Sequence, residues 1–139
     1  MEMTRTDFQK LSDLRVVEAR ALLDAGQYPG ARYLIGYAVE CALKACVAKQ
    51  VRQYDFPDKE LANKAFTHNL EQLVKAAGLE REFTEDMRSN RALDLNWAIV
   101  KDWSEAVRYE VGVTEPQARD LYSAITERDG ILPWVKIRW

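Results

Sequence analysis

The sequence is poor in the residues from which metal and redox sites are built. It has one histidine, His68, and two cysteines, Cys41 and Cys46. This set does not complete the four-ligand cage of a structural zinc site, so we expect no metal ion and no other cofactor. The cysteine spacing points the two thiols to different sides of a helix, where they cannot form a disulfide. We interpret them as reduced core thiols, which indicates a reducing compartment and a cytoplasmic protein.

Several sequence patterns that identify a class of protein are also missing. The first residues lack the apolar segment of a signal peptide, and no apolar run approaches the length of a membrane span. There is no glycine-rich phosphate-binding loop, and the serines have no evident base partner for nucleophilic catalysis. The net charge is −2, and no run of Lys or Arg stands out. We therefore expect no membrane association and no DNA partner.

Proline and glycine are scarce, with four and six residues, and no alternating strand pattern occurs. The apolar spacing predicts an all-α, up-and-down bundle of four to five helices that forms one domain over residues 1–139. The central helix is expected from about Pro29 or Gly30 to Gln53. Residues 33–47 are apolar on nearly every side, so other helices must cover this helix on nearly every side.

Capping signals bound the other helices. The first helix is expected to begin at Thr6 or Asp7 and to end at Gly26. A helix after the central one is expected to begin after an N-cap at Thr67 and to end at Gly78. Residues 58–66 are expected to add a short helical turn, whereas residues 79–90 have no clear period. A long helix that ends between residues 108 and 112 is expected on one apolar stripe, which consists of Leu93, Trp97, Val100, Trp103 and Val107.

The last helix is expected to begin at the capping box formed by Thr114 and Gln117. Its apolar period continues past residues 129–130, so helix is expected on both sides of them, with a kink at Pro133. Two tryptophans on the long stripe are expected in the core or in a dimer contact. The C-terminal pair, Trp134 and Trp139, belongs either to a tail that folds back or to a partner-binding tip.

Three segments together resemble the signature elements of HEPN domains. Residues 27–33 and 38–45, in the central helix, resemble the family's signature helix. Residues 67–73 resemble its second landmark, a short helix that opens on a histidine. Arg108 and Tyr109, at the end of a long helix, resemble the third. The segments occur in the family's order and spacing, and the resemblance covers nearly the whole chain.

The resemblance implies a four- or five-helix bundle that pairs as a homodimer. Many HEPN relatives act as metal-independent ribonucleases, often as toxins or defence components, and others are partners of small nucleotidyltransferases or bind nucleotides. The ribonuclease branch uses an arginine followed four to six residues later by a histidine. Here no arginine lies four to six residues before His68, and no histidine follows Arg108. The usual pair for taking the 2′-hydroxyl proton and protonating the leaving oxygen is missing.

We therefore expect a HEPN-like protein without catalytic residues. It would bind a nucleotide or RNA-type ligand, a partner nucleotidyltransferase, or both, in a toxin–antitoxin or defence context. Two alternatives stay open, namely a divergent HEPN ribonuclease that acts as a toxin and a purely structural helical interaction module. Each of the three assigns a different use to the same few polar side chains.

The first candidate site residues lie on the central helix. Glu40 and Lys44 are one helical turn apart among apolar neighbours. One possibility is that they form a simple ion pair. The other is that they form half of a ligand pocket, which would lie near Tyr37 at the dimer interface and would be completed by Arg108. A partly buried charge needs a partner, and Arg108 or Tyr109 is the expected one for this pair.

The other candidates come from the two later landmarks. His68 either contacts a phosphate or a base of the ligand, or caps and packs the junction between helices. Arg108 and Tyr109 either bind a phosphate and stack a base, or have a structural role at the end of the helix, where the positive charge of Arg108 complements the helix dipole.

Overall fold

The computed structural model describes residues 3–53 and 67–139. The turn expected over residues 58–66 lies outside this part of the chain. Within it, all regular structure is helical, which confirms the all-α prediction. The elements are α1 (Arg5–Asp24), α2 (Tyr28–Gln53), α4 (Leu70–Ala76), α5 (Glu80–Ser89), α6 (Arg91–Val100), the 3-10 helix η1 (Glu105–Tyr109), α7 (Glu115–Thr126) and α8 (Ile131–Lys136). None of these helices is both long and apolar enough to cross a membrane.

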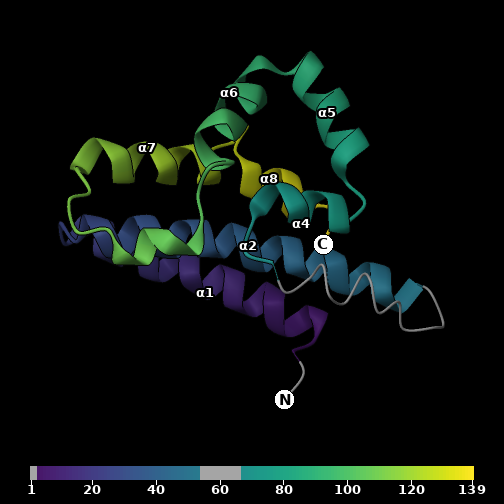
Figure 1. Ribbon diagram of the computed structural model, residues 1–139, viewed down its shortest axis with the longest axis horizontal. Helices are drawn as coiled ribbons and strands as arrows, with labels where there is room; N and C mark the ends of the chain where they lie inside the picture. Colours follow the sequence, from purple (N-terminus) through teal and green to yellow (C-terminus); the bar gives the residue numbers. More distant parts are fainter. Residues whose placement is uncertain (1–2, 54–66) are drawn as a thin grey trace.

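Helices α1 and α2 form a long antiparallel hairpin, visible along the lower part of Figure 1. The predicted start of α1 at Thr6 or Asp7 is wrong, because Thr4 is the N-cap and Asp7 completes its capping box. The end is as expected: Gly26 has a φ of 74°, a conformation that glycine adopts without strain. The tight connection after Gly26 turns the chain back along α1.

Helix α2 is the central element of the bundle. It packs against α1, α4, η1, α7 and α8, as the apolar coverage of its sequence predicts. Its fully buried side chains include Ile35, Val39 and Leu43. At Gly36 the indole ring of Trp103 lies only 2.2 Å from the position that a Cβ would occupy, so glycine is needed for this close approach.

The long helix expected through Leu93 and Val107 does not form as one piece, and this prediction is wrong. Helix α6 ends at Val100, and η1 carries Val107. The reason is tertiary: the Trp103 ring is buried on α2, where its indole N–H donates to the carbonyl of Arg32 at 3.2 Å. The backbone leaves the α6 axis to place the ring there.

Other boundaries follow from local chemistry. Asn69, rather than Thr67, is the N-cap of α4, and its side chain accepts from the N–H of Gln72 at 3.0 Å. Residues 79–90, which show no clear period in the sequence, contain α5. The capping box at Thr114 starts α7 as predicted.

The end of the chain is helical on both sides of residues 129–130, as expected. The break falls at Gly130, where a Cβ would meet the carbonyl oxygen of Ile125 at 2.6 Å. Pro133 lies in the first turn of α8, where its missing N–H leaves no bond unmade, so the expected kink is replaced by this break.

The C-terminal tail folds back onto α5. The indole N–H of Trp134 donates to Asp86 at 2.8 Å, and the Arg138 guanidinium lies 3.7 Å from the centroid of the Trp134 ring. Arg138 also forms ion pairs with Glu82 at 2.8 Å and with Asp86 at 3.2 Å. Of the two possibilities for this tail, the folded-back arrangement is the one observed.

Candidate functional site

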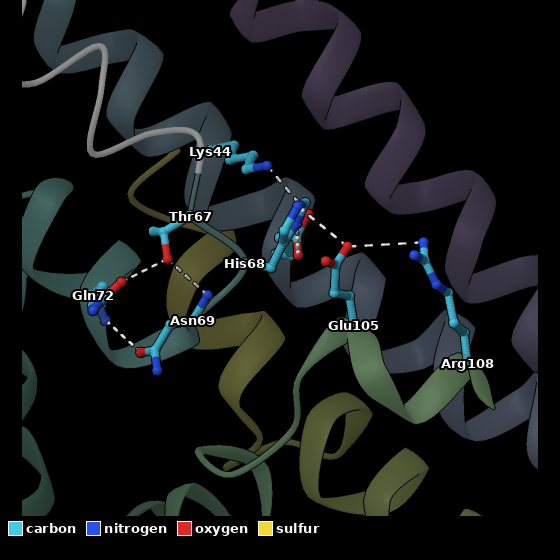
Figure 2. A network of polar contacts seen from close by, with 8 residues as sticks. Lys44, Thr67, His68, Asn69, Gln72, Glu105 and Arg108 are labelled. Carbon is cyan, nitrogen blue, oxygen red and sulfur yellow. Dashed lines mark hydrogen bonds and ion pairs between the residues drawn. The ribbon is translucent and has the colours of Figure 1, made fainter. Parts of the chain in front are cut away.

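A row of charged side chains runs from α2, through the segment before α4, to η1 (Figure 2). At its inner end, Glu40 is only 1% exposed. Lys44 Nζ donates to Glu40 Oε2 at 3.2 Å, and His68 Nδ1 lies 2.9 Å from Glu40 Oε1. At its outer end, His68 Nε2 lies 3.2 Å from Glu105 Oε2, and Arg108 NH1 lies 3.9 Å from the same oxygen.

Local structure positions the histidine. The side chain of Thr67 accepts from the N–H of Asn69 at 3.1 Å and donates to Gln72 Oε1 at 2.6 Å. These bonds tie the extended stretch before α4 to the first turn of that helix. The His68 ring points away from α4 toward Glu105, as Figure 2 shows.

The buried carboxylate of Glu40 needs these partners. An ionised carboxylate without water is costly unless donors surround it, and Lys44 and His68 supply one to each oxygen. The contact between Glu40 Oε1 and Nδ1 of His68 orients the imidazole ring. The Nε2 edge then faces outward, and the side chain of His68 is 41% exposed.

Glu105 was not among the residues that the sequence singles out. Its only sequence signal is the spacing of three residues before Arg108, which is common on helical surfaces. In the structure its carboxylate lies between His68 and Arg108, and its side chain is 37% exposed. Glu105 therefore faces the Nε2 edge of the ring that Glu40 contacts at Nδ1.

Arg108 and Tyr109 form the exposed end of the row. Arg108 NH2 donates to the hydroxyl of Tyr109 at 2.8 Å, and its guanidinium lies 4.8 Å from the centroid of that ring. The hydrogen bond to Tyr109 and the charge of Glu105 raise the pKa of Arg108, which therefore stays charged. Tyr109 is 73% exposed, so its ring is accessible to a ligand.

Tyr37 belongs to an aromatic row beside the charged one. Its ring centroid lies 6.0 Å from that of Tyr33, which in turn stacks on Trp103 at 6.2 Å. The guanidinium of Arg15 lies 5.8 Å from the Tyr37 centroid. Burial raises the pKa of the Tyr37 phenol, so Tyr37 remains protonated at neutral pH.

The structure thus brings together five of the residues that the sequence singles out, namely Glu40, Lys44, His68, Arg108 and Tyr109. Their connections differ from the expected ones. The partner from another element that buried Glu40 finds is His68 rather than Arg108 or Tyr109, and Arg108 joins the row through Glu105. His68 does not cap α4, since Asn69 does.

The arrangement supports two kinds of chemistry. Outward-facing donors from His68 and Arg108 suit the binding of an anion, and a ring held by a buried carboxylate suits proton transfer. In the described part of the chain, no group of three or more His, Cys, Asp or Glu side chains is placed to hold a metal ion.

Comparisons of this chain with protein-family models, with curated proteins and with solved structures found no match. Any assignment of function therefore depends on the residues of the chain itself and on the geometry of the site.

Proposed function

We propose that this chain is a HEPN-like protein that binds a nucleotide or RNA-type ligand through its phosphate, without cleaving it. One observation carries the proposal. His68 Nε2 and Arg108 NH1 both face the same carboxylate oxygen of Glu105, at 3.2 Å and 3.9 Å. Two donors that converge on one exposed oxygen form a site for an anion, and arginine is well suited to phosphate.

The neighbouring aromatic residue extends the site beyond a single phosphate. Tyr109 is exposed, and Arg108 already lies against its ring. A base stacked on such a ring contributes about 1–3 kcal/mol to binding without strong sequence preference. A phosphate at Arg108 with a base on Tyr109 describes a nucleotide or a short stretch of single-stranded RNA.

A binding experiment tests the proposal. A fluorescent single-stranded RNA oligonucleotide is titrated with the wild-type protein and with Arg108→Ala and Tyr109→Ala. We expect each substitution to weaken binding about tenfold or more. The matched control is Arg119→Ala, because Arg119 is about as exposed as Arg108 and also pairs with a glutamate, but lies on α7. Equal losses in Arg108→Ala and Arg119→Ala would mean general charge attraction, and the proposed site would be wrong.

The homodimer and the partner are parts of the same proposal, supported by the resemblance of residues 27–33, 38–45 and 67–73 to HEPN elements. The proposed context is a toxin–antitoxin or defence pair with a nucleotidyltransferase. Light scattering on the purified protein measures the mass of the particle, and a monomer at micromolar concentration would contradict the dimer. Co-expression with a nucleotidyltransferase encoded beside this chain tests the partner by co-purification.

A second candidate function, RNA cleavage, is favoured by the contact between Glu40 and His68. A buried carboxylate that orients an imidazole is a common feature of catalytic bases. In such a reaction, Nε2 of His68 would take the proton of the 2′-hydroxyl and the 2′-oxygen would attack the adjacent phosphorus. The bond to the 5′-oxygen would break, and that oxygen would take a proton from water. The products would be a 2′,3′-cyclic phosphate and a 5′-hydroxyl.

Incubation with labelled RNA separates the two functions. Cleavage by the wild type that is lost in His68→Ala and in Arg108→Ala would establish the ribonuclease and overturn our first choice. Binding without cleavage, lost in Arg108→Ala, would support it. Arg119→Ala, purified in separate batches, is the control for a contaminating nuclease. The activity of a contaminant would vary between batches and would not depend on which residue is substituted.

A further inference from the structure

Two glutamates contact the same histidine in different ways. Glu40 is buried, accepts from two donors and belongs to the interior of the bundle. Glu105 is at the surface, on the first residue of a short 3-10 helix, and its partners His68 and Arg108 are both more than a third exposed. The two carboxylates therefore have different roles: the inner one orients the ring, and the outer one covers its exposed edge.

The outer contact is weak enough to exchange. Ion pairs between exposed side chains contribute little to stability, because solvent screens them and both side chains lose freedom. The Glu105–Arg108 distance of 3.9 Å is also at the long end for an ion pair. An anion that reaches Nε2 of His68 and the guanidinium of Arg108 can replace the Glu105 carboxylate without disturbing Glu40.

We propose that Glu105 is a built-in competitor of the ligand, whose carboxylate occupies the place of the ligand phosphate. The proposal rests on the proposed function, since it assumes that a phosphate binds at His68 and Arg108. It also specifies the class of ligand. A phosphomonoester carries close to two negative charges at neutral pH and a diester carries one, so a monoester gains more from the guanidinium of Arg108 and loses more from the competing charge of Glu105.

Removal of the competing charge is the direct test. Glu105→Gln keeps the size of the side chain and removes its charge, and Glu105→Ala removes both. Glu115→Gln is the matched control, because Glu115 is also the first residue of its helix, is exposed and pairs with an arginine. Thermal unfolding of all variants ensures that they are compared in the folded state, and exposed substitutions of this kind shift stability little.

The first readout needs no ligand. His68 is the single histidine of the chain, so its modification by diethyl pyrocarbonate is measured without interference from other histidines. If Glu105 holds Nε2, Glu105→Gln and Glu105→Ala raise the modification rate about three- to fivefold, and Glu115→Gln leaves it unchanged. An unchanged rate in both Glu105 variants would overturn the proposal.

The second readout uses adenosine, 3′,5′-cyclic AMP and AMP as probes, titrated calorimetrically. The gain in affinity on Glu105→Gln is expected to rise with the charge of the probe: none for adenosine, about threefold for cyclic AMP and about tenfold for AMP. A gain of the same size with Glu115→Gln, or a gain for adenosine, would overturn the proposal.

The outcomes also separate this inference from the proposed function. If the wild type binds the RNA oligonucleotide through Arg108 but Glu105→Gln gains nothing for AMP, Glu105 is no competitor and the proposed function stands. If neither the wild type nor Glu105→Gln binds RNA or AMP, the proposed function fails, and the inference fails with it.

Discussion

The carboxylate of Glu40, almost wholly buried in α2, holds the ring of His68, whose Nδ1 lies 2.9 Å from Glu40 Oε1. The two residues are 28 positions apart in the sequence. Their contact joins the central helix to the start of α4 and sets which edge of the imidazole faces outward. It is at once a structural link and the feature that orients the candidate site.

The first prediction concerns this contact. Glu40→Gln leaves Lys44 without its counter-charge and Nδ1 of His68 without its carboxylate, so we expect a loss of about 1–3 kcal/mol in the free energy of unfolding. Urea denaturation followed by tryptophan fluorescence measures it. Glu115→Gln, which removes a glutamate from an exposed pair, should stay within about 0.5 kcal/mol of the wild type. Equal effects of the two substitutions would contradict a structural role for Glu40.

The second prediction concerns the close approach of Trp103 to α2. Gly36→Ala places a methyl group where the indole ring lies, so we expect destabilisation by about 1–3 kcal/mol in spite of alanine's better helix propensity. The thermal unfolding midpoint and the tryptophan emission spectrum record the change. Gly112→Ala is the control, because nothing lies within 4 Å of its Cβ position.

A double variant checks the cause of this effect. In the background of Trp103→Ala, the added methyl group at position 36 meets no ring, and Gly36→Ala should become neutral or slightly stabilising. If Gly36→Ala is as damaging with alanine at 103 as with tryptophan, steric conflict with the indole is not the reason.

The third prediction concerns the two thiols. Burial raises the pKa of Cys41 to about 12 and that of Cys46 to about 11, so neither forms thiolate at pH 8. Because the thiolate is the reactive species, a thiol reagent should label the folded protein only at the rate of unfolding. In urea both cysteines should react at once. Rapid labelling of one cysteine in the folded protein would show that this cysteine is accessible.

The fourth prediction is that these thiols also impose a dependence of stability on pH. Their folded-state pKa values lie above the unfolded reference of 9.0, so their contribution is complete below pH 9 and declines as the pH rises toward 11–12. The unfolded chain releases thiol protons over this range, while the folded chain keeps them. The double variant Cys41→Ala, Cys46→Ala should show a smaller loss of stability between pH 8 and pH 10.5. An unchanged loss would contradict the raised pKa values.

The fifth prediction concerns the tail. Arg138→Ala removes two ion pairs with α5 and the stacking on Trp134, so we expect a loss of about 1–2 kcal/mol and a shift in tryptophan emission. Arg81→Ala is the control, because Arg81 forms one highly exposed pair on α5. A fluorescence change without a change in stability would mean that the tail detaches without affecting the bundle.

Much of the fold could be predicted because its signals are local. The glycine at position 26, the capping box at Thr114 and the apolar coverage of α2 all act within a few residues of chain, and all three have the expected structure. The failed predictions have a different origin. The stripe through Trp103 has a perfect helical period, yet the helix stops at Val100 because the indole is more favourably buried against Gly36.

The features of the candidate site also divide into those that local sequence predicts and those that depend on tertiary packing. The sequence by itself determined that Glu40 and Lys44 share a face of a central helix, since 3.6 residues per turn places i and i+4 side by side. It also singled out His68 and Arg108. Only the tertiary structure decided that His68 is the partner of Glu40 and that Glu105 lies between His68 and Arg108. The contacts of His68 with Glu40 and with Glu105 join residues far apart in the chain, and no helical period relates them, because packing alone sets their distance.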